Sequence, residues 1–421
     1  MRVGIIGSGG REHSICHSLN KSDRIEQIYC FPGNAGTAKI AKNVDINLEI
    51  FEELKNFIKL NKIDLVVVGP EKPLVDGIVD FLEKNNIKVF GPNKIASQLE
   101  GSKIFTKQIC KKFNIPTAKF DIFESADNAN IFAESANYPL VIKADGLASG
   151  KGVFICKNKD EAKEAVKEVF DGKFGEAKNL LIEEFLDGEE MSFFIITDGE
   201  TVKKFGTAQD HKRVFEGDKG KNTGGMGAYS PSRLINKELE EKILDKIIKP
   251  TMIGLKEINT TYKGFLYVGL MIINNEPYLI EYNVRMGDPE CQTILPKLDS
   301  DLLNIFLKCC DGKLHETEIK WIDEKSLCIV LCSKGYPDVF KKDILIENLD
   351  KIKLNKNEFC YHAGTKIEKD KIYSSGGRVL NFVCVSQNFN DSRNKIYELI
   401  DILNWENGFF RKDIGHKVIN K

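Results

Sequence analysis

Short apolar runs and longer amphipathic stretches alternate along the N-terminal part of the chain. The short runs are rich in Val and Ile and are typical of buried strands, whereas the longer stretches repeat apolar residues every three or four positions, as helices do. This alternation predicts a doubly wound parallel sheet, whose ligands bind beyond the carboxyl ends of the strands. The predicted strands are residues 2–6, 25–30, 64–68 and 88–90, and the predicted helices are residues 11–19, 51–60 and 74–84.

The pattern changes after a helical stretch at residues 95–113, where Pro116 ends the helical periodicity and a second unit begins. Residues 206–231 are rich in Gly and polar side chains, and we expect a long irregular segment there, of a kind that is usually functional or disordered. His211, within this segment, is expected to have no acid–base role. Further strands are predicted at residues 119–123, 140–143, 153–156, 180–185, 265–273, 279–284, 326–333 and 379–385, and further helices at residues 236–257, 301–310 and 392–403.

Length and composition describe a multidomain globular protein without a highly charged surface. A chain of 421 residues predicts two to four domains. Its net charge of -1 gives no general reason to bind nucleic acid or an anionic membrane, so that any phosphate site must be local. The 11 cysteines form no CxxC pair, which favours reduced thiols. The start of the chain has no cleavage signal, and no stretch approaches the roughly 20 apolar residues that span a bilayer. We therefore expect a cytoplasmic protein.

Three polar side chains share one face of the strand predicted at residues 279–284 and of the turn that follows it. Glu281, Asn283 and Arg285 point to one side, whereas Ile280 and the apolar residues between the polar ones point to the other. A carboxylate and an amide oxygen suit Mg²⁺, and an arginine beside them can stabilise a phosphoryl group. For this segment taken alone, an exposed strand face with an incidental ion pair explains the residues slightly better.

Two glycine-rich loops are of a kind that binds phosphate. The loop at residues 7–10 fails as a dinucleotide fingerprint, because Glu12 occupies the third glycine position and the second strand ends without an acidic residue. We interpret it as a site for a smaller phosphorylated metabolite, with a plain structural turn as the alternative. The loop at residues 143–153 has three glycines and two lysines, which suits a flap that closes over a polyphosphate, with an exposed hairpin as the alternative.

A series of short motifs, in this order along the whole chain, resembles the phosphoribosylamine–glycine ligases, a family of ATP-grasp enzymes. One such motif would be weak evidence, but the ordered set is specific. The motifs are GSGGREH, PGNAGT, VGPE, LEGSK, KADGLASGKGV, IEEFLDGEE, QDHKR, NTGGMGAYSP, EYNVRMGDPE, HAGT and SSGGRVL.

The resemblance implies an α/β fold with an N-terminal doubly wound parallel sheet, a two-lobed ATP-grasp fold and a small C-terminal αβ domain. The implied boundaries are 1–100, 101–325 with a mobile lobe at about 118–190, and 326–421. The implied activity is the ATP-dependent ligation of glycine to 5-phosphoribosylamine in purine biosynthesis, through glycyl phosphate. The alternatives are another ATP-grasp carboxylate–amine ligase and, more remotely, a non-enzymatic nucleotide-binding sensor. An NAD-dependent oxidoreductase is disfavoured by the failed fingerprint. We expect a monomer whose partners are small molecules, without nucleic acid or membrane.

The resemblance also implies roles for individual residues, while the shared strand face suggests Arg285 as a catalytic residue. Glu281 and Asn283 would bind Mg²⁺ or Mn²⁺. Many ATP-grasp enzymes add an acidic ligand on the preceding strand, but residues 267–271 have no carboxylate, which leaves the number of metals open. The implied ATP-binding residues are Lys107, Lys143, Ser149, Gly150, Lys151, Gly152, Val153, Glu183, Glu184, Phe185, Leu186 and Glu190, and the implied substrate-binding residues are Gly9, Gly10, Arg11, Glu12, Asn34, Asp210, Lys212, Asp288 and Arg378.

Overall fold

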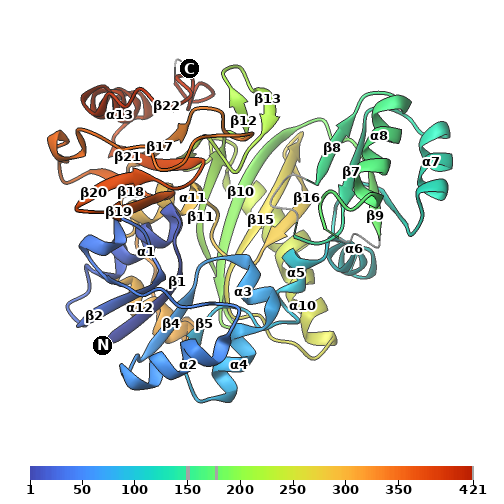
Figure 1. The fold of residues 1–421 in the computed structure, drawn as a ribbon. Helices are drawn as coiled ribbons and strands as arrows, with labels where there is room; N and C mark the ends of the chain where they lie inside the picture. Colours follow the sequence, from blue (N-terminus) through green and yellow to red (C-terminus); the bar gives the residue numbers. More distant parts are fainter. Residues whose placement is uncertain (148–151, 176–178, 420–421) are drawn as a thin grey trace.

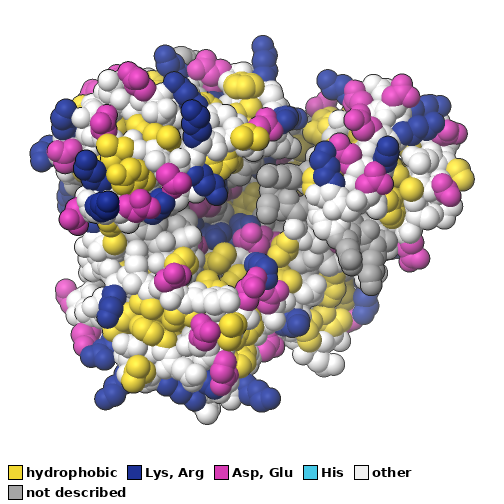
Figure 2. All heavy atoms as spheres, viewed as in Figure 1, with side chains coloured by type: hydrophobic (Ala, Val, Ile, Leu, Met, Phe, Trp, Pro, Cys, Tyr) yellow, Lys and Arg dark blue, Asp and Glu magenta, His cyan; other side chains and the backbone are white. Residues whose placement is uncertain are grey.

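The computed structural model describes residues 1–147, 152–175 and 179–419. Figure 1 shows the N-terminal sheet in blue beside a long central sheet, a small lobe in teal that extends to one side, and the C-terminal strands in orange and red that continue the central sheet. In the space-filling view, the surface is hollowed between the N-terminal part, the C-terminal part and the small lobe, and charged side chains lie in the hollow (Figure 2).

The N-terminal sheet has five parallel strands in the order β3-β2-β1-β4-β5. The order reverses between β1 and β4, so the loops after these two strands open at the same crevice. Gly77, with φ +98°, interrupts the helix that was predicted at residues 74–84. The elements are β1 (Arg2–Gly7), α1 (Gly10–Leu19), β2 (Gln27–Pro32), β3 (Lys42–Asn43), α2 (Phe51–Leu60), β4 (Leu65–Val68), α3 (Glu71–Asp76), α4 (Ile78–Lys84) and β5 (Val89–Phe90).

The small lobe is a four-stranded antiparallel sheet with two helices packed on it. Its strand order is β6-β9-β7-β8, and its core is built of small and branched apolar residues such as Ala129, Ile142 and Val166. Two helices lead into this lobe, and Ser102 caps the second by accepting a hydrogen bond from the backbone N–H of Phe105. The elements are α5 (Gln98–Gly101), α6 (Lys103–Lys112), β6 (Phe120–Phe123), α7 (Ala126–Ser135), β7 (Leu140–Ala144), β8 (Val153–Cys156), α8 (Lys159–Phe170) and β9 (Leu180–Glu184).

The central sheet has nine strands, and it runs without interruption into the C-terminal part of the chain. Its order is β16-β15-β10-β11-β14-β17-β21-β18, with β22 also paired to β17. The pairing of β14 with β17 crosses the boundary predicted near residue 325. The elements are β10 (Glu189–Thr197), β11 (Val202–Asp210), β14 (Gly227–Ser230), β15 (Gly264–Ile273), β16 (Glu276–Asn283), β17 (Lys325–Ser333), β18 (Glu358–His362), β21 (Arg378–Ser386) and β22 (Gly408–Phe409).

The prediction of an irregular segment at residues 206–231 was wrong. The end of β11, a two-stranded hairpin and β14 occupy it, and only short turns join them. The remaining elements are β12 (Arg213–Phe215), β13 (Lys219–Asn222), α9 (Lys237–Ile243), the π-helix η2 (Leu244–Ile248), α10 (Lys249–Glu257), α11 (Glu290–Ile294), α12 (Leu302–Cys310), β19 (Thr365–Glu368), β20 (Lys371–Ser374), α13 (Phe389–Leu403), and the 3₁₀ helices η1 (Thr37–Lys39), η3 (Leu295–Lys297), η4 (Leu314–Glu316) and η5 (Leu349–Lys351).

Apolar packing fixes the N-terminal sheet against the central sheet. Phe90 of β5 lies against Phe265 of β15, with ring centroids 5.1 Å apart, and against Phe306 of α12, at 4.1 Å. All three rings belong to one buried cluster that includes residues of both sheets. The loops after β1 and β4 are thereby held beside the end of β16.

Candidate active site

Two lysines and one glutamate form a buried group where α6 meets the small lobe. The Glu183 carboxylate on β9 lies 2.9 Å from the Lys143 Nζ and 3.2 Å from the Lys107 Nζ, and each side chain is at most 6% exposed. Burial would raise the pKa of Glu183, but the two lysines outweigh it and keep this pKa below its ordinary value. The predicted phosphate-binding lysines therefore lie together, and Glu183 neutralises part of their charge.

The other residues predicted to bind ATP are spread along the strands beside this group. Glu184 is exposed and accepts a hydrogen bond from the Lys119 backbone N–H at 2.9 Å. Gly152 is buried, and its carbonyl accepts a hydrogen bond from the Ala144 N–H at 2.8 Å. Val153 and Leu186 are half-buried, Phe185 is exposed, and Glu190 is exposed on β10. Ser149, Gly150 and Lys151 of the predicted flap lie outside the described residues.

Hydrogen bonds connect β16 to the segment of the chain that leads into the small lobe. The Leu279 N–H donates to the Pro116 carbonyl at 2.8 Å, and the Thr117 hydroxyl donates to the Leu279 carbonyl at 2.7 Å. Lys107 donates to the Thr117 hydroxyl. This contact brings the lysines of α6 next to the strand that carries the predicted metal ligands.

A β-bulge adjusts the faces of β16. Gly269 pairs with Glu281 but Leu270 pairs with Leu279, so Ile280 has no partner of its own across the hairpin. Leu279 rather than Ile280 joins the core with Tyr282 and Val284, which corrects the face predicted for Ile280. A bulge redirects side chains in this way by inserting one residue into a strand.

Glu281 and Asn283 are half-exposed. They lie on the same face of the β15–β16 hairpin as Tyr267 of β15. A Cβ added at Gly269 would lie 3.2 Å from the Glu281 Cγ, so the glycine makes room for this carboxylate. Within residues 1–147, 152–175 and 179–419, no three His, Cys, Asp or Glu side chains gather into a metal site. One carboxylate and one amide oxygen nevertheless fit Mg²⁺, which usually completes its coordination with water and substrate phosphates.

The charge of Glu281 affects two lysines. Burial lowers the pKa of Lys103, and Glu281 is the carboxylate that opposes this shift most. Burial would also lower the pKa of Lys212, but Glu190, Asp210 and other groups, Glu281 among them, outweigh it and raise this pKa well above its ordinary value. The site therefore contains both lysines and carboxylates that influence one another's charge.

An acidic group lies beside Lys212. The Lys212 Nζ is 2.7 Å from the Glu190 Oε2. Burial, together with Glu290 and Glu190, raises the pKa of Asp210 to about 7 against the opposing effect of Lys212. Glu290 is buried and accepts a hydrogen bond from the Ser192 hydroxyl at 3.2 Å. Neither Glu290 nor Ser192 was predicted, although Glu290 ends the motif that contains Glu281.

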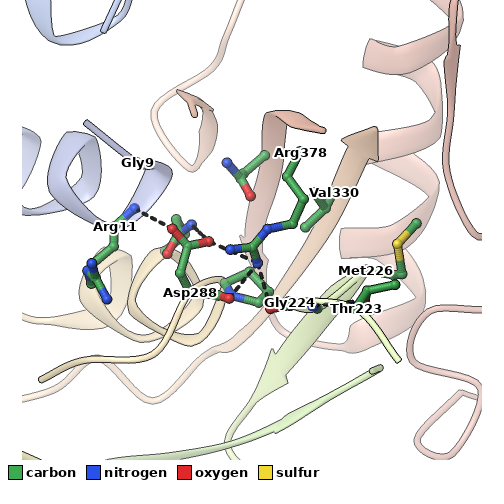
Figure 3. A network of polar contacts seen from close by, with 12 residues as sticks. Gly9, Arg11, Thr223, Gly224, Met226, Asp288, Val330 and Arg378 are labelled. Carbon is green, nitrogen blue, oxygen red and sulfur yellow. Dashed lines mark hydrogen bonds and ion pairs between the residues drawn. The ribbon is translucent and has the colours of Figure 1, made fainter. Parts of the chain in front are cut away.

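Asp288 joins three parts of the fold, as Figure 3 shows. Its Oδ2 accepts a hydrogen bond from the Arg11 backbone N–H at 3.1 Å, and its Oδ1 accepts one from the Gln292 Nε2 at 2.8 Å. The Arg378 Nη1 lies 3.3 Å from the Asp288 Oδ1 and donates to the backbone carbonyls of Asp288 and Gly224, at 2.5 and 2.7 Å. Asp288 and Arg378, both predicted to bind substrate, are therefore in contact although 90 residues separate them.

The other predicted substrate residues surround the start of α1. The Glu12 carboxylate accepts hydrogen bonds from the Gly9 N–H at 2.7 Å and from the Arg11 Nε at 2.6 Å. The Asn34 Nδ2 donates to the carbonyls of Ser8 and His362, both at 2.8 Å. Glu12 and Asn34 thus hold the glycine-rich loop in shape and connect it to β18.

Arg285 is the third residue of the group predicted with Glu281 and Asn283. Its guanidinium forms ion pairs with carboxylates from the N-terminal part of the chain. Its Nη2 lies 2.6 Å from the Glu100 Oε1, and its Nε lies 3.2 Å from the Glu71 Oε2. Neither partner was predicted, because both lie far away in the sequence.

His211 is buried and contacts the C-terminal end of the described chain. Its Nε2 accepts a hydrogen bond from the Gly415 N–H at 3.2 Å, and burial lowers its pKa to about 3. All 11 cysteines are free thiols. In the described part of the chain, no helix is both long and apolar enough to cross a bilayer.

Comparison with known families accounts for this arrangement. Models of phosphoribosylglycinamide synthetase match three consecutive parts of the chain: the N domain matches residues 1–100, the ATP-grasp (A) domain residues 101–291, and the C domain residues 326–417. The chain belongs to the phosphoribosylglycinamide synthetase family.

Individual members of the phosphoribosylglycinamide synthetase family align with the whole chain. The phosphoribosylamine–glycine ligase of Brucella melitensis is 45% identical over 422 residues, which cover 100% of this chain and 99% of the relative. The enzyme of that name from Caldanaerobacter subterraneus is 46% identical, with 99% of each chain covered. The crystal structure of phosphoribosylamine–glycine ligase from Thermotoga maritima is 32% identical, has a TM-score of 0.84, and covers 99% of this chain and 100% of that one. The predicted fold class is confirmed.

Proposed function

We propose that this chain joins glycine to 5-phosphoribosylamine at the expense of ATP, giving glycinamide ribonucleotide, ADP and phosphate in purine biosynthesis. Its family membership supports the reaction. The structural observation that carries the proposal is the buried group of Lys107, Lys143 and Glu183, which hydrogen bonds through Thr117 and Leu279 join to β16. Phosphoryl transfer depends mainly on positioning and charge neutralisation, and these residues provide both.

Two steps account for the products. A carboxylate oxygen of glycine attacks the γ-phosphorus of ATP, the bond to the β-phosphate oxygen breaks, and glycyl phosphate and ADP form. The amine nitrogen of 5-phosphoribosylamine then attacks the carbonyl carbon, phosphate leaves with the bonding electrons, and the nitrogen loses a proton. In this proposal, Lys107 and Lys143 hold the ATP phosphates, while the loop at Gly9–Glu12, with Asn34, Asp288 and Arg378, lines the site of the amine.

Glu281 and Asn283 would hold a divalent cation, Mg²⁺ or Mn²⁺, which neutralises charge on the phosphoryl oxygens when it is bound. Adenine and ribose would lie along Glu183–Leu186 and Glu190, with residues 149–153 as the flap. We further propose that the enzyme acts in the cytoplasm as a monomer, which agrees with its free cysteines and its nearly balanced charge.

Arg285 is proposed to assist the transfer of the phosphoryl group, either directly or through the groups that it holds in place. Replacing Arg285 by Ala should lower kcat much more than it weakens ATP binding, because the ground-state contacts to ATP come from other residues. Steady-state kinetics together with nucleotide titration would measure both quantities. An unchanged kcat would refute the role.

ADP release measured with glycine and 5-phosphoribosylamine, and with each omitted in turn, tests the proposed function. Release that requires both substrates supports it. If another carboxylate replaced glycine, the chain would be a different ATP-grasp carboxylate–amine ligase. Nucleotide binding without glycine-dependent ADP release would instead indicate a sensor.

A further inference from the structure

A group of ion pairs joins the end of β16 to the N-terminal sheet. The Arg285 guanidinium lies between Glu100 and Glu71, at 2.6 and 3.2 Å. The second oxygen of Glu100 accepts a hydrogen bond from the backbone N–H of Val284 at 2.8 Å. We call Arg285, Glu100, Glu71 and the Val284 N–H the Glu100 brace. Glu100 therefore holds both a side chain and the backbone immediately after Asn283.

The two carboxylates of the Glu100 brace belong to helices that pack on each other. Glu71 is the first residue of α3, directly after the loop that follows β4, and Glu100 lies in α5. A Cβ added at Gly101 would lie 3.1 Å from both methyl groups of Val75, so α5 approaches α3 closely at this glycine. The two carboxylates are therefore held on packed helices beside the edge of the N-terminal sheet.

The charges around Arg285 favour a fixed arrangement. Burial would lower the pKa of Arg285, but Glu100 and Glu71, with smaller contributions from Glu290 and Glu281, outweigh it, so the guanidinium stays charged. The Arg285 side chain is 17% exposed and that of Glu100 is 8% exposed. Burial also raises the pKa of Glu100 to about 7, against the opposing effect of Arg285. Replacing Glu100 would remove one of the two carboxylates that compensate the buried charge of Arg285.

A second arginine approaches the same segment from the N-terminal sheet. The Arg11 Nη1 donates to the Met286 carbonyl at 3.1 Å, and the Arg285 Nη1 approaches that carbonyl at 3.4 Å. The segment after β16 is therefore fixed from the loop after β1 and from the helix after β4. Arg11 lies in the first turn of α1 and Glu71 begins α3, and these helices follow β1 and β4, between which the crevice opens.

We propose that Glu100 is a positioning residue for amide formation: through Arg285 and the Val284 N–H, it aligns the amine held by the N-terminal sheet with the acyl phosphate held over β16. This proposal rests on the proposed function. The lysines and the strand that hold ATP belong to the small lobe, α6 and the central sheet, so acyl phosphate can form without this alignment. Attack by the amine needs it, since a displacement of about 1 Å costs on the order of a hundredfold in rate.

Two measurements on Glu100→Gln test the proposal. Positional isotope exchange in ATP labelled at the β,γ-bridge, with glycine but without amine, reports reversible formation of the acyl phosphate. The rate of glycinamide ribonucleotide formation reports both steps. We expect exchange to fall severalfold at most, because Arg285 keeps Glu71 as a partner, and product formation to fall about tenfold further, because only the second step needs the amine aligned with the acyl phosphate.

Asp311→Asn provides a matched control. Asp311 pairs with Lys88 at 2.6 Å and also ties the N-terminal part of the chain to the rest, but this pair is exposed and Lys88 precedes the amino end of β5, whereas the crevice lies beyond the carboxyl ends of the strands. Both measurements should stay near wild type in this variant, because exposed ion pairs contribute little. Circular dichroism and thermal unfolding would verify that each variant is folded.

The outcomes separate this proposal from the proposed function. Wild-type protein without glycine-dependent exchange would refute the proposed function itself. If wild type is active and Glu100→Gln lowers exchange and product formation equally, or lowers neither, the positioning role is refuted. If Glu100→Gln does not fold, Glu71→Gln gives the same test. We expect a smaller loss of product formation in that variant, because Glu71 is 30% exposed and lies farther from Arg285. Equal effects on exchange and product formation would again refute the role.

Discussion

Replacing Glu183 by Gln should destabilise the small lobe far more than the same replacement at Glu184. The two residues are neighbours on β9, but Glu183 lies between two buried lysines, whereas Glu184 is exposed and receives a backbone N–H. At an effective dielectric constant of about 20, charges 2.9 and 3.2 Å apart attract by roughly 5 to 6 kcal/mol before desolvation is counted. Removing one partner of such a buried group costs about 3 to 5 kcal/mol, while an exposed glutamate contributes less than about 1 kcal/mol.

Hydrogen exchange measured by mass spectrometry on peptides from β7 and β9 is a suitable assay, because exchange reports the free energy of local opening. Glu183→Gln should exchange much faster than Glu184→Gln without nucleotide. Added Mg-ATP should narrow this difference, since the triphosphate would supply the negative charge that Lys107 and Lys143 have lost. Equal exchange in the two variants without nucleotide would refute the reasoning about the buried charges, and a difference that ATP leaves unchanged would refute the proposed contact with phosphate.

Three further changes probe the site and its support. Gly269→Ala should raise the metal concentration needed for half-maximal activity with little change in Tm, because the new methyl group displaces Glu281; an unaltered metal requirement would contradict this. Gly10→Ala should lower stability by about 1 to 3 kcal/mol in urea unfolding, because its Cβ would lie within 2.5 Å of two buried side-chain amides; wild-type stability would show that these amides can move. Burial lowers the pKa of His362 to about 3, so its contribution to stability is complete above pH 6.5 and is lost as the pH falls. Between pH 6.5 and 5 the loss is at most about 2 kcal/mol, and His362→Gln should reduce the pH dependence of the unfolding free energy, whereas a change at the exposed His315 should not.

The N-terminal sheet could be predicted closely because its strands are short apolar runs bounded by turn residues. β1, β2, β4 and β5 begin and end within two residues of their predicted limits. The missing strand, β3, consists of Lys42 and Asn43, which carry no apolar signal. The break at Gly77 was missed because the helical period continues through it, and only the positive φ separates α3 from α4.

The strands of residues 206–231 were missed because their sequences have neither the length nor the alternation that identifies a strand. β13 is Lys219–Asn222 and is exposed throughout, whereas β14 is Gly227–Ser230 and is buried throughout. Both strands depend on pairing: β13 pairs with β12, and β14 lies between β11 and β17. Tertiary pairing, which one sequence does not reveal, decides such segments.

At the site, the kinds of residue could be predicted but not their partners. The alternation along β16 correctly gave Glu281 and Asn283 a common face. The bulge at Ile280 could not be foreseen, since it arises from pairing with β15. The partners of Arg285 could not be foreseen either, because Glu71 and Glu100 are 214 and 185 residues away along the chain. Such distant contacts decide whether an arginine side chain is free to bind substrate or forms ion pairs within the protein.

The ladder between β14 and β17 has a consequence for any attempt to divide this protein. Gly227–Ser230 hydrogen-bond in register with Ser326–Ile329, so the C-terminal part of the chain completes a sheet that begins in the ATP-grasp region. A fragment that stops before β17 would leave β14 as an open apolar edge, which invites pairing with other chains. Truncation or exchange of the last hundred residues should therefore produce aggregates instead of a shorter soluble enzyme.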